Sequence, residues 1–405
     1  MPKPPLHGLR IIETATGISG PYAGRLLASL GACVVKIEPS DGDPARIQQV
    51  DDIPLAEGEL SPLFIHLNAG KLNVKPDDID PSWADVVIAG DVLADLKNSQ
   101  WDPTRLRSHD TRLVTTTAWG ADAQDAGTIA DELLVQTATG FLGFNGDQDL
   151  PPLRLPGWQS QYAAGGLASA MVQLIGRTDA SHIDVSWLGA LLTATELCYG
   201  DALHCQRVRS KVGAHPPTAF PSGAIKCKDG HFAPGSIRPV DWEMQCLFYG
   251  LPEWVDDPEL RNRLKRRNHI QMIWDQITPW YLEREKREIF ELALDSPWAA
   301  GMVMTPLDTL SDPHLSERQY LGAIDTPQGT AIGPTRPFRA PGLPVSDQSV
   351  RVKASDPAPV DQQRAPLKLR SFSDLRLIEM TISWAGPYVG NILSPLGIEV
   401  IKIES

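Results

Sequence analysis

The sequence contains no apolar run of transmembrane length, and residues 1–5 carry no signal-peptide pattern. Cysteine is scarce as well: there are five in 405 residues, an odd number without the spacing of metal ligands. These features predict a cytoplasmic protein with free thiols and no metal site.

Positive charge is in short supply. The chain has 37 lysines and arginines against 50 acidic residues, which gives a formal net charge of −13. Proteins that bind nucleic acids generally need a basic surface, so this balance argues against that class. The hydrophobic fraction of 42% is that of a globular protein, and the length allows two or three domains.

A strand–helix–strand pattern opens the chain and organises the rest of it. Residues 9–13 are a short, β-branched apolar run that predicts a buried strand, and residues 32–38 predict a second one. Between them, Gly17 and Gly20 favour a tight turn, and Pro21 suits the first position of a helix. The pattern places a helix N-terminus above a strand end, which is typical of sites for phosphate or other anions.

The opening pattern returns at the end of the chain. Residues 375–404 align with residues 9–38, and about half of the aligned positions are identical. A repeat of this kind indicates a duplicated structural unit. We expect residues 370–405 to form the first βαβ of a second repeat and the sequence to belong to a longer tandem protein. A short protein that ends here is the alternative.

Strands and helices alternate along the chain, which predicts an α/β fold with a doubly wound parallel sheet. The further elements that we expect are buried strands over residues 84–89, 112–117 and 183–186 and helices over residues 161–175 and 188–204. The expected domains are a large Rossmann-like domain, a smaller α+β domain, and a return segment with a linker, over residues 1–215, 216–330 and 331–369.

Several short motifs share an order and spacing that is more specific than any one of them. They are Gly20-Pro21, Asn68-Ala69-Gly70-Lys71, Ala163-Ala164-Gly165, Asp184-Val185-Ser186 and Lys228-Asp229-Gly230. Over most of residues 7–340 the chain resembles the family III CoA-transferases, the CaiB/BaiF family. The resemblance implies a Rossmann-like large domain with a smaller domain, and two units interlocked as a dimer or as fused halves. It also implies an acyl-CoA and a carboxylic acid as substrates, without a covalently bound cofactor.

The family's transfer chemistry implies an aspartate nucleophile. Its carboxylate attacks the acyl-CoA thioester to give a mixed anhydride, and CoA then forms an aspartyl thioester that the acceptor acid resolves. The aligned position, just before the small-residue helix, is Gln161. A carboxamide is a poor nucleophile, so we expect no catalytic residue in this unit. The racemase branch would lose its Asp at Gln161 too, and its His near Ala130.

The resemblance implies that the nucleotide of CoA contacts the first turn, at Gly17, Ile18, Ser19 and Gly20. Lys71 matches a basic position of the family, although a surface turn residue is an equal alternative there. Other positions lack the polar side chains of the family. Pro39 stands where the family often has a basic residue, and Ala89-Gly90 stands where it has Glu-Asn.

Three functions stay open on this basis. The first is one half of a CoA-transferase, and the second is a non-catalytic acyl-CoA-binding protein that pairs with an active partner. The third, an NAD-dependent oxidoreductase, is disfavoured because the glycines do not follow G-x-G-x-x-G. Asp147 and Asp149 are candidates for a displaced carboxylate, although a solvated turn is favoured. His66 and His182 are interpreted as structural.

Overall fold

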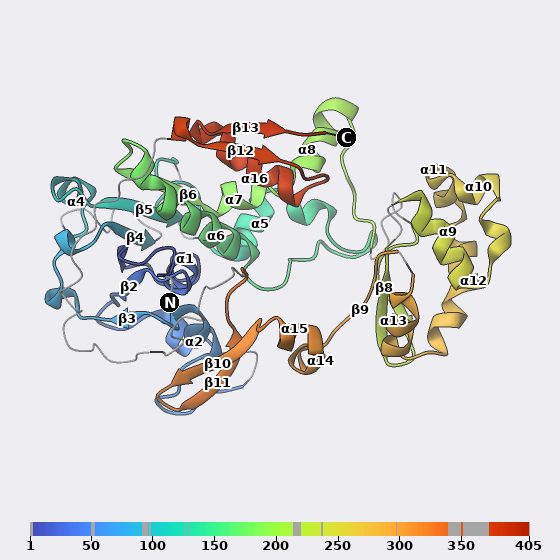
Figure 1. Cartoon of the computed structure of the whole chain (residues 1–405), viewed down its shortest axis with the longest axis horizontal. Coiled ribbons are helices and arrows are strands. Elements are labelled where there is room, and N and C mark those ends of the chain that lie inside the picture. Colours follow the sequence, from blue (N-terminus) through green and yellow to red (C-terminus); the bar gives the residue numbers. More distant parts are fainter. Residues whose placement is uncertain are drawn as a thin grey trace. The chain divides into compact units, whose positions relative to one another are not determined.

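The computed structural model of the chain describes residues 3–49, 53–90, 96, 99–124, 126–128, 130–213, 220–235, 238–296, 298–338, 350 and 372–404. The chain forms two compact units. The larger unit comprises Met1–Thr139, Pro156–Thr195 and Gln319–Ser405, and the smaller comprises Gly140–Leu155 and Glu196–Arg318. Figure 1 shows the elements of each, coloured along the chain. No helix among the described residues is long and apolar enough to cross a membrane.

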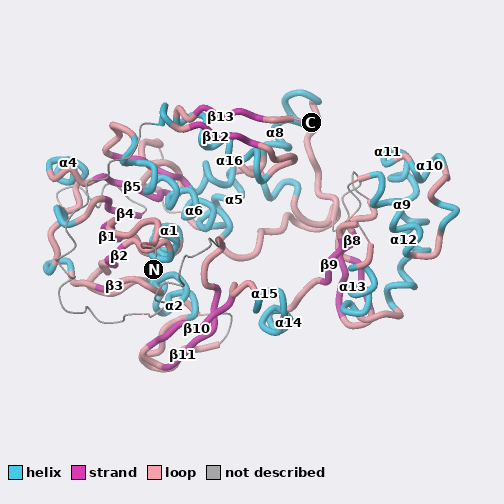
Figure 2. Tube along the Cα trace, viewed as in Figure 1, coloured by secondary structure: helices cyan, strands magenta, loops and turns pink. Residues whose placement is uncertain are grey.

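The larger unit is built on a six-stranded parallel sheet with the strand order β3-β2-β1-β4-β5-β6; Figure 2 labels β1 to β5 and Figure 1 labels β6. Its strands are β1 (Arg10–Glu13), β2 (Cys33–Lys36), β3 (Leu72–Asn73), β4 (Val86–Gly90), β5 (Arg112–Thr117) and β6 (His182–Ser186). The strand order reverses between β1 and β4, which confirms the predicted doubly wound sheet. In open α/β sheets, ligands bind beyond the carboxyl ends of the strands at this reversal.

Helices pack on both faces of this sheet. They are α1 (Ser19–Ser29), α2 (Pro62–Asn68), α4 (Pro103–Ser108), α5 (Glu132–Ala138), α6 (Gln159–Leu174) and α7 (Trp187–Leu192). Successive side chains of a strand point to opposite faces. Ile11 of β1 therefore packs in a core with Leu27 of α1 and Ala164 of α6, whereas Ile12 packs in a second core with Leu106 of α4. Burial on both faces explains why β1 is a continuous apolar run.

One predicted helix is two helices. The apolar run over residues 188–204 contains α7 and then α8 (Glu196–Cys205). Between them, the hydroxyls of Thr193 and Thr195 donate to the carbonyls of Ala190 and Leu192. Side-chain bonds of this kind compete with the helical backbone bonds, so the single-helix prediction is wrong at this point.

The unit boundaries differ from those expected from the sequence. Gly140–Leu155 belongs to the smaller unit, and the chain returns to the larger unit at Gln319 rather than after residue 330. The return is fixed by a hairpin of β10 (Leu321–Thr326) and β11 (Gly329–Pro334). Ile324 of this hairpin packs against Phe64 of α2, a contact between residues far apart in sequence. The expected boundary at residue 215 and most of the linker lie outside the described residues.

The smaller unit combines a three-stranded antiparallel sheet with helices. Its elements are α8, β7 (Ile225–Cys227), β8 (Gly230–Pro234), α9 (Pro239–Phe248), α10 (Pro258–Arg261), α11 (Arg263–Arg266), α12 (Ile270–Leu282), α13 (Lys286–Leu294), β9 (Ala300–Met302), α14 (Pro306–Ser311) and α15 (Pro313–Glu317). Its core is rich in aromatic residues, among them Phe232, Trp242 and Tyr281. It therefore folds around a core of its own, as a separate domain does.

The last described segment repeats the opening of the chain. It consists of β12 (Arg376–Glu379), α16 (Ala385–Leu393) and β13 (Glu399–Lys402). The two strands pair in parallel with the register of β1 and β2, so that Glu379 lies beside Lys402 as Glu13 lies beside Lys36. The hydroxyl of Tyr388 on α16 lies 2.7 Å from that of Thr193 in the larger unit. A second βαβ is present; the longer tandem protein stays a prediction.

Candidate functional site

The site begins at the turn between β1 and α1, beyond the carboxyl end of β1. Gly17 has a φ of +73°, in the left-handed region that glycine adopts without strain. Gly20 is required for a different reason: a Cβ there would lie 2.2 Å from the Cβ of Ala15. These two glycines let α1 start directly above the end of the strand.

The N-terminus of α1 is not capped by a side chain. Ile18, at the N-cap, makes no side-chain hydrogen bond, and the first turn contains no acidic residue. The first N–H groups of a helix have no partner within the helix, and the helix dipole makes this end positive. The end of α1 therefore has the chemistry of an anion site.

The predicted CoA contacts differ in their accessibility. Gly17 is partly exposed, whereas Ile18, Ser19 and Gly20 are buried. The hydroxyl of Ser19 donates to the hydroxyl of Thr116 over 2.9 Å and accepts from Nε1 of Trp187 over 3.0 Å. The Ser19 side chain thus joins α1 to β5 and α7. A role for these four residues in CoA binding stays a prediction, and Gly17 is the only one of the four that is partly exposed.

Helix α6 crosses the start of α1 at very short range. A Cβ on Gly165 would lie 2.4 Å from the backbone oxygen of Ser19, so only glycine allows this approach. Gln161 precedes Gly165 by four residues and therefore lies on the same face of the helix. The Gln161 side chain is 8% exposed. The structure thus places Gln161 at the third position of α6, on the face that meets the β1–α1 turn.

At this position an aspartate and a glutamine would differ in charge and in reactivity. The positive end of a helix stabilises a negative charge in its first turn, so an aspartate there would be held ionised. The carboxamide of Gln161 carries no charge and has no basic oxygen that could attack a thioester. That residue 161 is the nucleophile position of the family stays a prediction.

A buried carboxylate that the sequence analysis did not single out lies next to Gln161. Glu132, on α5, is 3% exposed. Its Oε1 accepts hydrogen bonds from the backbone N–H of Ser160 and from Nε2 of Gln136, each over 2.8 Å, and its Oε2 accepts from the hydroxyl of Ser160 over 2.7 Å. Glu132 therefore caps α6 with both oxygens engaged. The signal in the sequence was an acidic residue at the start of an otherwise apolar helix.

Lys71 lies below the turn in a buried ion cluster. Its ammonium lies 2.8 Å from Oε2 of Glu13 and donates to the carbonyl oxygen of Pro21 over 2.8 Å and to Oδ1 of Asn68 over 3.1 Å. Burial lowers the pKa of Lys71 to about 8, although Glu13 opposes the shift. At 2% exposure, Lys71 is not a surface turn residue, so that alternative is wrong. A phosphate could reach it only if the ammonium left Glu13.

Lys36 and Asp43 belong to the same buried ion cluster and connect it to the β1–α1 turn. The ammonium of Lys36 lies 3.2 Å from Oε1 of Glu13 and 2.7 Å from Oδ2 of Asp43. Burial lowers the pKa of Lys36, but the two carboxylates outweigh it and the net shift is upward. Oδ1 of Asp43 accepts from the backbone N–H of Gly17 over 3.3 Å. The buried charges therefore hold the turn in place.

The other candidate functional residues do not belong to the β1–α1 turn or to the buried ion cluster. Asp147 and Asp149 are exposed in the smaller unit, where Oδ1 of Asp147 accepts from the N–H of Asp149 as in a solvated turn. His182 lies 2.8 Å from the hydroxyl of Thr115, and burial lowers its pKa. Within the described ranges, no cluster of three or more His, Cys, Asp or Glu residues is arranged to hold a metal ion.

Known proteins resemble the chain over most of its length. A family model described as CoA-transferase family III matches residues 6–363. The succinate–glutarate CoA-transferase of Agrobacterium fabrum is 25% identical over 353 residues, which cover 82% of this chain and 88% of that protein. The formyl-CoA:oxalate CoA-transferase of Streptomyces avermitilis is 25% identical over 378 residues, with coverages of 84% and 90%.

The fold is shared with a solved structure as well. The crystal structure of a CaiB/BaiF family protein from Brucella suis superposes with a TM-score of 0.74 at 22% identity, covering 87% of this chain and 97% of that chain.

Proposed function

Because the chain belongs to CoA-transferase family III, we propose that it binds an acyl-CoA at the β1–α1 turn but cannot form the covalent intermediates of CoA transfer. One observation carries this proposal. Gln161 occupies the third position of α6, on the face that meets the turn, where the transfer chemistry needs a carboxylate. Glu132, the neighbouring carboxylate, is engaged by Ser160 and Gln136 through both oxygens.

The names of the relatives support one class of substrate. Two of them are named for succinate, glutarate and oxalate, all short dicarboxylic acids. We propose that the acyl-CoA is the CoA thioester of such an acid and that the acceptor is another one. The uncapped N-terminus of α1 supports an anionic ligand at the turn.

The working aspartate would then come from a second family III unit. The βαβ of residues 376–402 supports a fused second unit, with the two halves interlocked. The alternative is a separate, active partner chain, with this chain acting as a non-catalytic acyl-CoA-binding subunit. Co-purification with an active partner favours the alternative, whereas self-association alone argues against it. We place both in the cytoplasm, where the five free cysteines would stay reduced.

The proposal is tested by transfer of CoA from succinyl-CoA to glutarate. The purified chain alone should give no transfer, and Gln161→Ala should leave that result unchanged. Gln161→Asp should not restore full activity, because Pro39 and Ala89-Gly90 have lost the polar CoA contacts of the family. The exposed Gln159 offers a matched control, Gln159→Ala. Robust turnover that Gln161→Ala abolishes and Gln159→Ala spares would overturn the proposal.

A further inference from the structure

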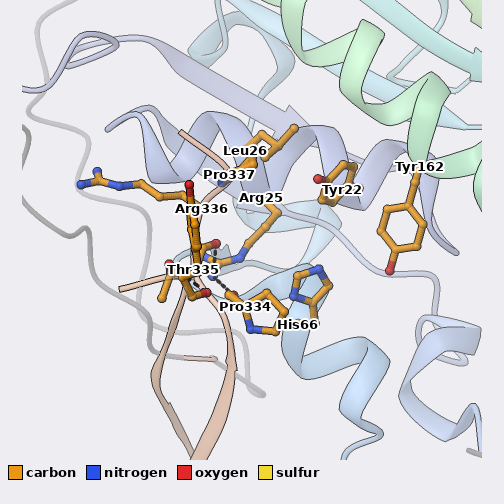
Figure 3. A pocket seen from close by; sticks show the side chains of 10 residues that line it. Tyr22, Arg25, Leu26, His66, Tyr162, Pro334, Thr335, Arg336 and Pro337 are labelled. Atoms are coloured by element: carbon orange, nitrogen blue, oxygen red, sulfur yellow. Dashed lines mark hydrogen bonds between the residues drawn. The ribbon is translucent and has the colours of Figure 1, made fainter. Parts of the chain in front are cut away.

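A cavity of about 240 Å³ lies in the larger unit, on the side of α1 that faces α2 (Figure 3). Helices α1, α2 and α6 contribute to its wall, together with Tyr320 and residues 334–337 of the returning chain. It lies next to the candidate site, since Tyr162 directly follows Gln161 on α6. None of the residues assigned to CoA binding lines it.

The charged residues of the lining are of one sign. Among the described residues, it contains Arg25 and Arg336 and no Asp or Glu. Arg25 is 1% exposed and donates to the carbonyl oxygens of Ala69 over 3.1 Å and Thr335 over 3.3 Å, which fixes its guanidinium at the cavity wall (Figure 3). Burial lowers the pKa of Arg25 to about 10, so it stays charged at neutral pH. The cavity therefore favours a negative ligand.

Three further polar groups belong to this lining. The rings of Tyr22 and Tyr162 meet edge to face, with centroids 4.8 Å apart. Among the described residues neither hydroxyl has a hydrogen-bond partner, and burial raises the pKa of both phenols, so both remain donors. Nδ1 of His66 is buried without a hydrogen-bond partner. A buried polar atom in this state costs free energy that a ligand atom can recover.

We propose that this cavity binds the carboxylate of a small organic acid, with Tyr22, Tyr162 and His66 as its hydrogen-bonding partners. Leu26, Pro334 and Pro337 supply the apolar wall against which the carbon chain of the acid packs. The volume is below the range of about 300–1,000 Å³ that is usual for drug-sized ligands and suits a much smaller molecule. An acid of about five carbon atoms, such as glutarate, has the right size and charge.

The proposal rests on the proposed function only for the kind of acid, because the relatives act by name on short dicarboxylic acids. It adds a place for the acid that is separate from the β1–α1 turn. A second measurable consequence concerns His66. Its ring centroid lies 6.3 Å from that of Tyr22, and the charges of Arg25 and Lys71 act on it, while Tyr162 and Arg336 belong to the same lining. Burial, followed by the charges of Arg25 and Lys71, lowers its pKa to about 4. A bound carboxylate should raise this pKa.

The test is calorimetric titration of the full chain with glutarate, in the absence of CoA, against glutaramide and inorganic phosphate at matched ionic strength. We expect saturable glutarate binding that is at least tenfold tighter than that of either control. Tyr162→Phe and His66→Leu should each weaken it roughly three- to tenfold, because each removes one hydrogen bond to a charged group. His314→Leu, at an exposed histidine of the smaller unit, is the matched control and should change nothing.

The NMR titration of the His66 imidazole gives the second readout, and glutarate should move its pKa upward. Absence of saturable glutarate binding, equal binding of glutaramide, or binding that survives both substitutions overturns the proposal. Because no step of this test involves CoA or turnover, its failure leaves the proposed function standing. Conversely, unexpected transfer activity would leave a measured acid site intact.

Discussion

The two βαβ units of this chain share their backbone and differ in their surroundings. Glu13 in the first unit and Glu379 in the second both lie at the end of their first strand, and in each a Cβ on the facing glycine of the helix would meet the carboxylate within 2.3 Å. Glu13 is fully buried between Lys36 and Lys71. Glu379 is 7% exposed, and its cation is Lys402, 3.6 Å away.

The difference extends to the turn after the strand. Ile18 at the start of α1 is 5% exposed, whereas Trp384 at the equivalent place is 62% exposed. Gly17 has a φ of +73°, and Ser383 takes the same conformation at +71°. The comparison teaches that local sequence determines the βαβ unit, whereas distant neighbours determine whether it becomes a site. The first unit has α2 and α6 around its turn.

The two βαβ units should differ most when the carboxylate at the end of the first strand, Glu13 or Glu379, is removed. Glu13→Gln leaves the buried ammonium of Lys71 without a carboxylate and leaves Lys36 with Asp43 alone, so it should lower the free energy of unfolding by about 3–5 kcal/mol. Glu379→Gln affects a pair whose lysine is 44% exposed, so we expect a loss below about 1 kcal/mol. Urea denaturation measures both values, and equal losses would contradict the comparison.

His66, on α2, should make the free energy of unfolding depend on pH. The folded pKa of His66 is about 4, below its ordinary value of 6.5, so the folded state favours the neutral imidazole. This contribution is complete above pH 6.5 and is lost as the pH falls toward 4. It should amount to about 3 kcal/mol. The difference in the free energy of unfolding between the unmodified chain and His66→Gln should therefore change by this amount over the window. Parallel curves would exclude the effect.

The contact with α6 is tested by two adjacent glycines. Gly165→Ala places a Cβ 2.4 Å from the backbone oxygen of Ser19 and should cost about 1–3 kcal/mol through displacement of α6. Gly166 has open space around its Cβ position, so Gly166→Ala should stabilise the helix by up to about 1 kcal/mol. Thermal unfolding compares the two. A neutral Gly165→Ala would mean that α6 does not depend on this contact.

The smallest effect concerns the turn itself. Ser383→Gly should stabilise the chain by up to about 1 kcal/mol, because it relieves a left-handed conformation that a side chain disfavours. Gly17→Ser should cost about as much, since space for the side chain is open at Gly17 and only the backbone strain remains. Denaturant titrations measure both changes in the free energy of unfolding. Changes of opposite sign would support the equivalence of the two turns, and changes of the same sign would contradict it.

Much of the fold was predictable because its signals are local. The strands β1, β2, β4 and β5 are buried on both faces, so each is a continuous apolar run in the sequence. Glycines mark the first turn because that turn needs a backbone conformation and a close approach that other residues disfavour. The break between α7 and α8 at Thr193–Thr195 was not predicted, because it depends on side-chain hydroxyls that donate hydrogen bonds to backbone carbonyls. The return at Gln319 depends on Ile324 meeting Phe64, which no local pattern encodes.

The site was predicted in part. The place of Gln161 followed from the small-residue pattern of α6, and Gly165 shows why that pattern is needed. Lys71 was predicted at a surface or phosphate position, whereas a buried partner 58 residues away, Glu13, determines its place. Glu132 was missed because the partner that makes it part of the site, Ser160, lies 28 residues along the chain.

The most direct test of the central claim is the mass of the intact chain after incubation with succinyl-CoA. Transfer through a carboxylate leaves an acyl or CoA group covalently attached to the enzyme before the acceptor acid is added. We predict an unchanged mass for the chain with Gln161. An added acyl or CoA mass that peptide mapping places on Glu132, or on any other carboxylate of this chain, would contradict the account.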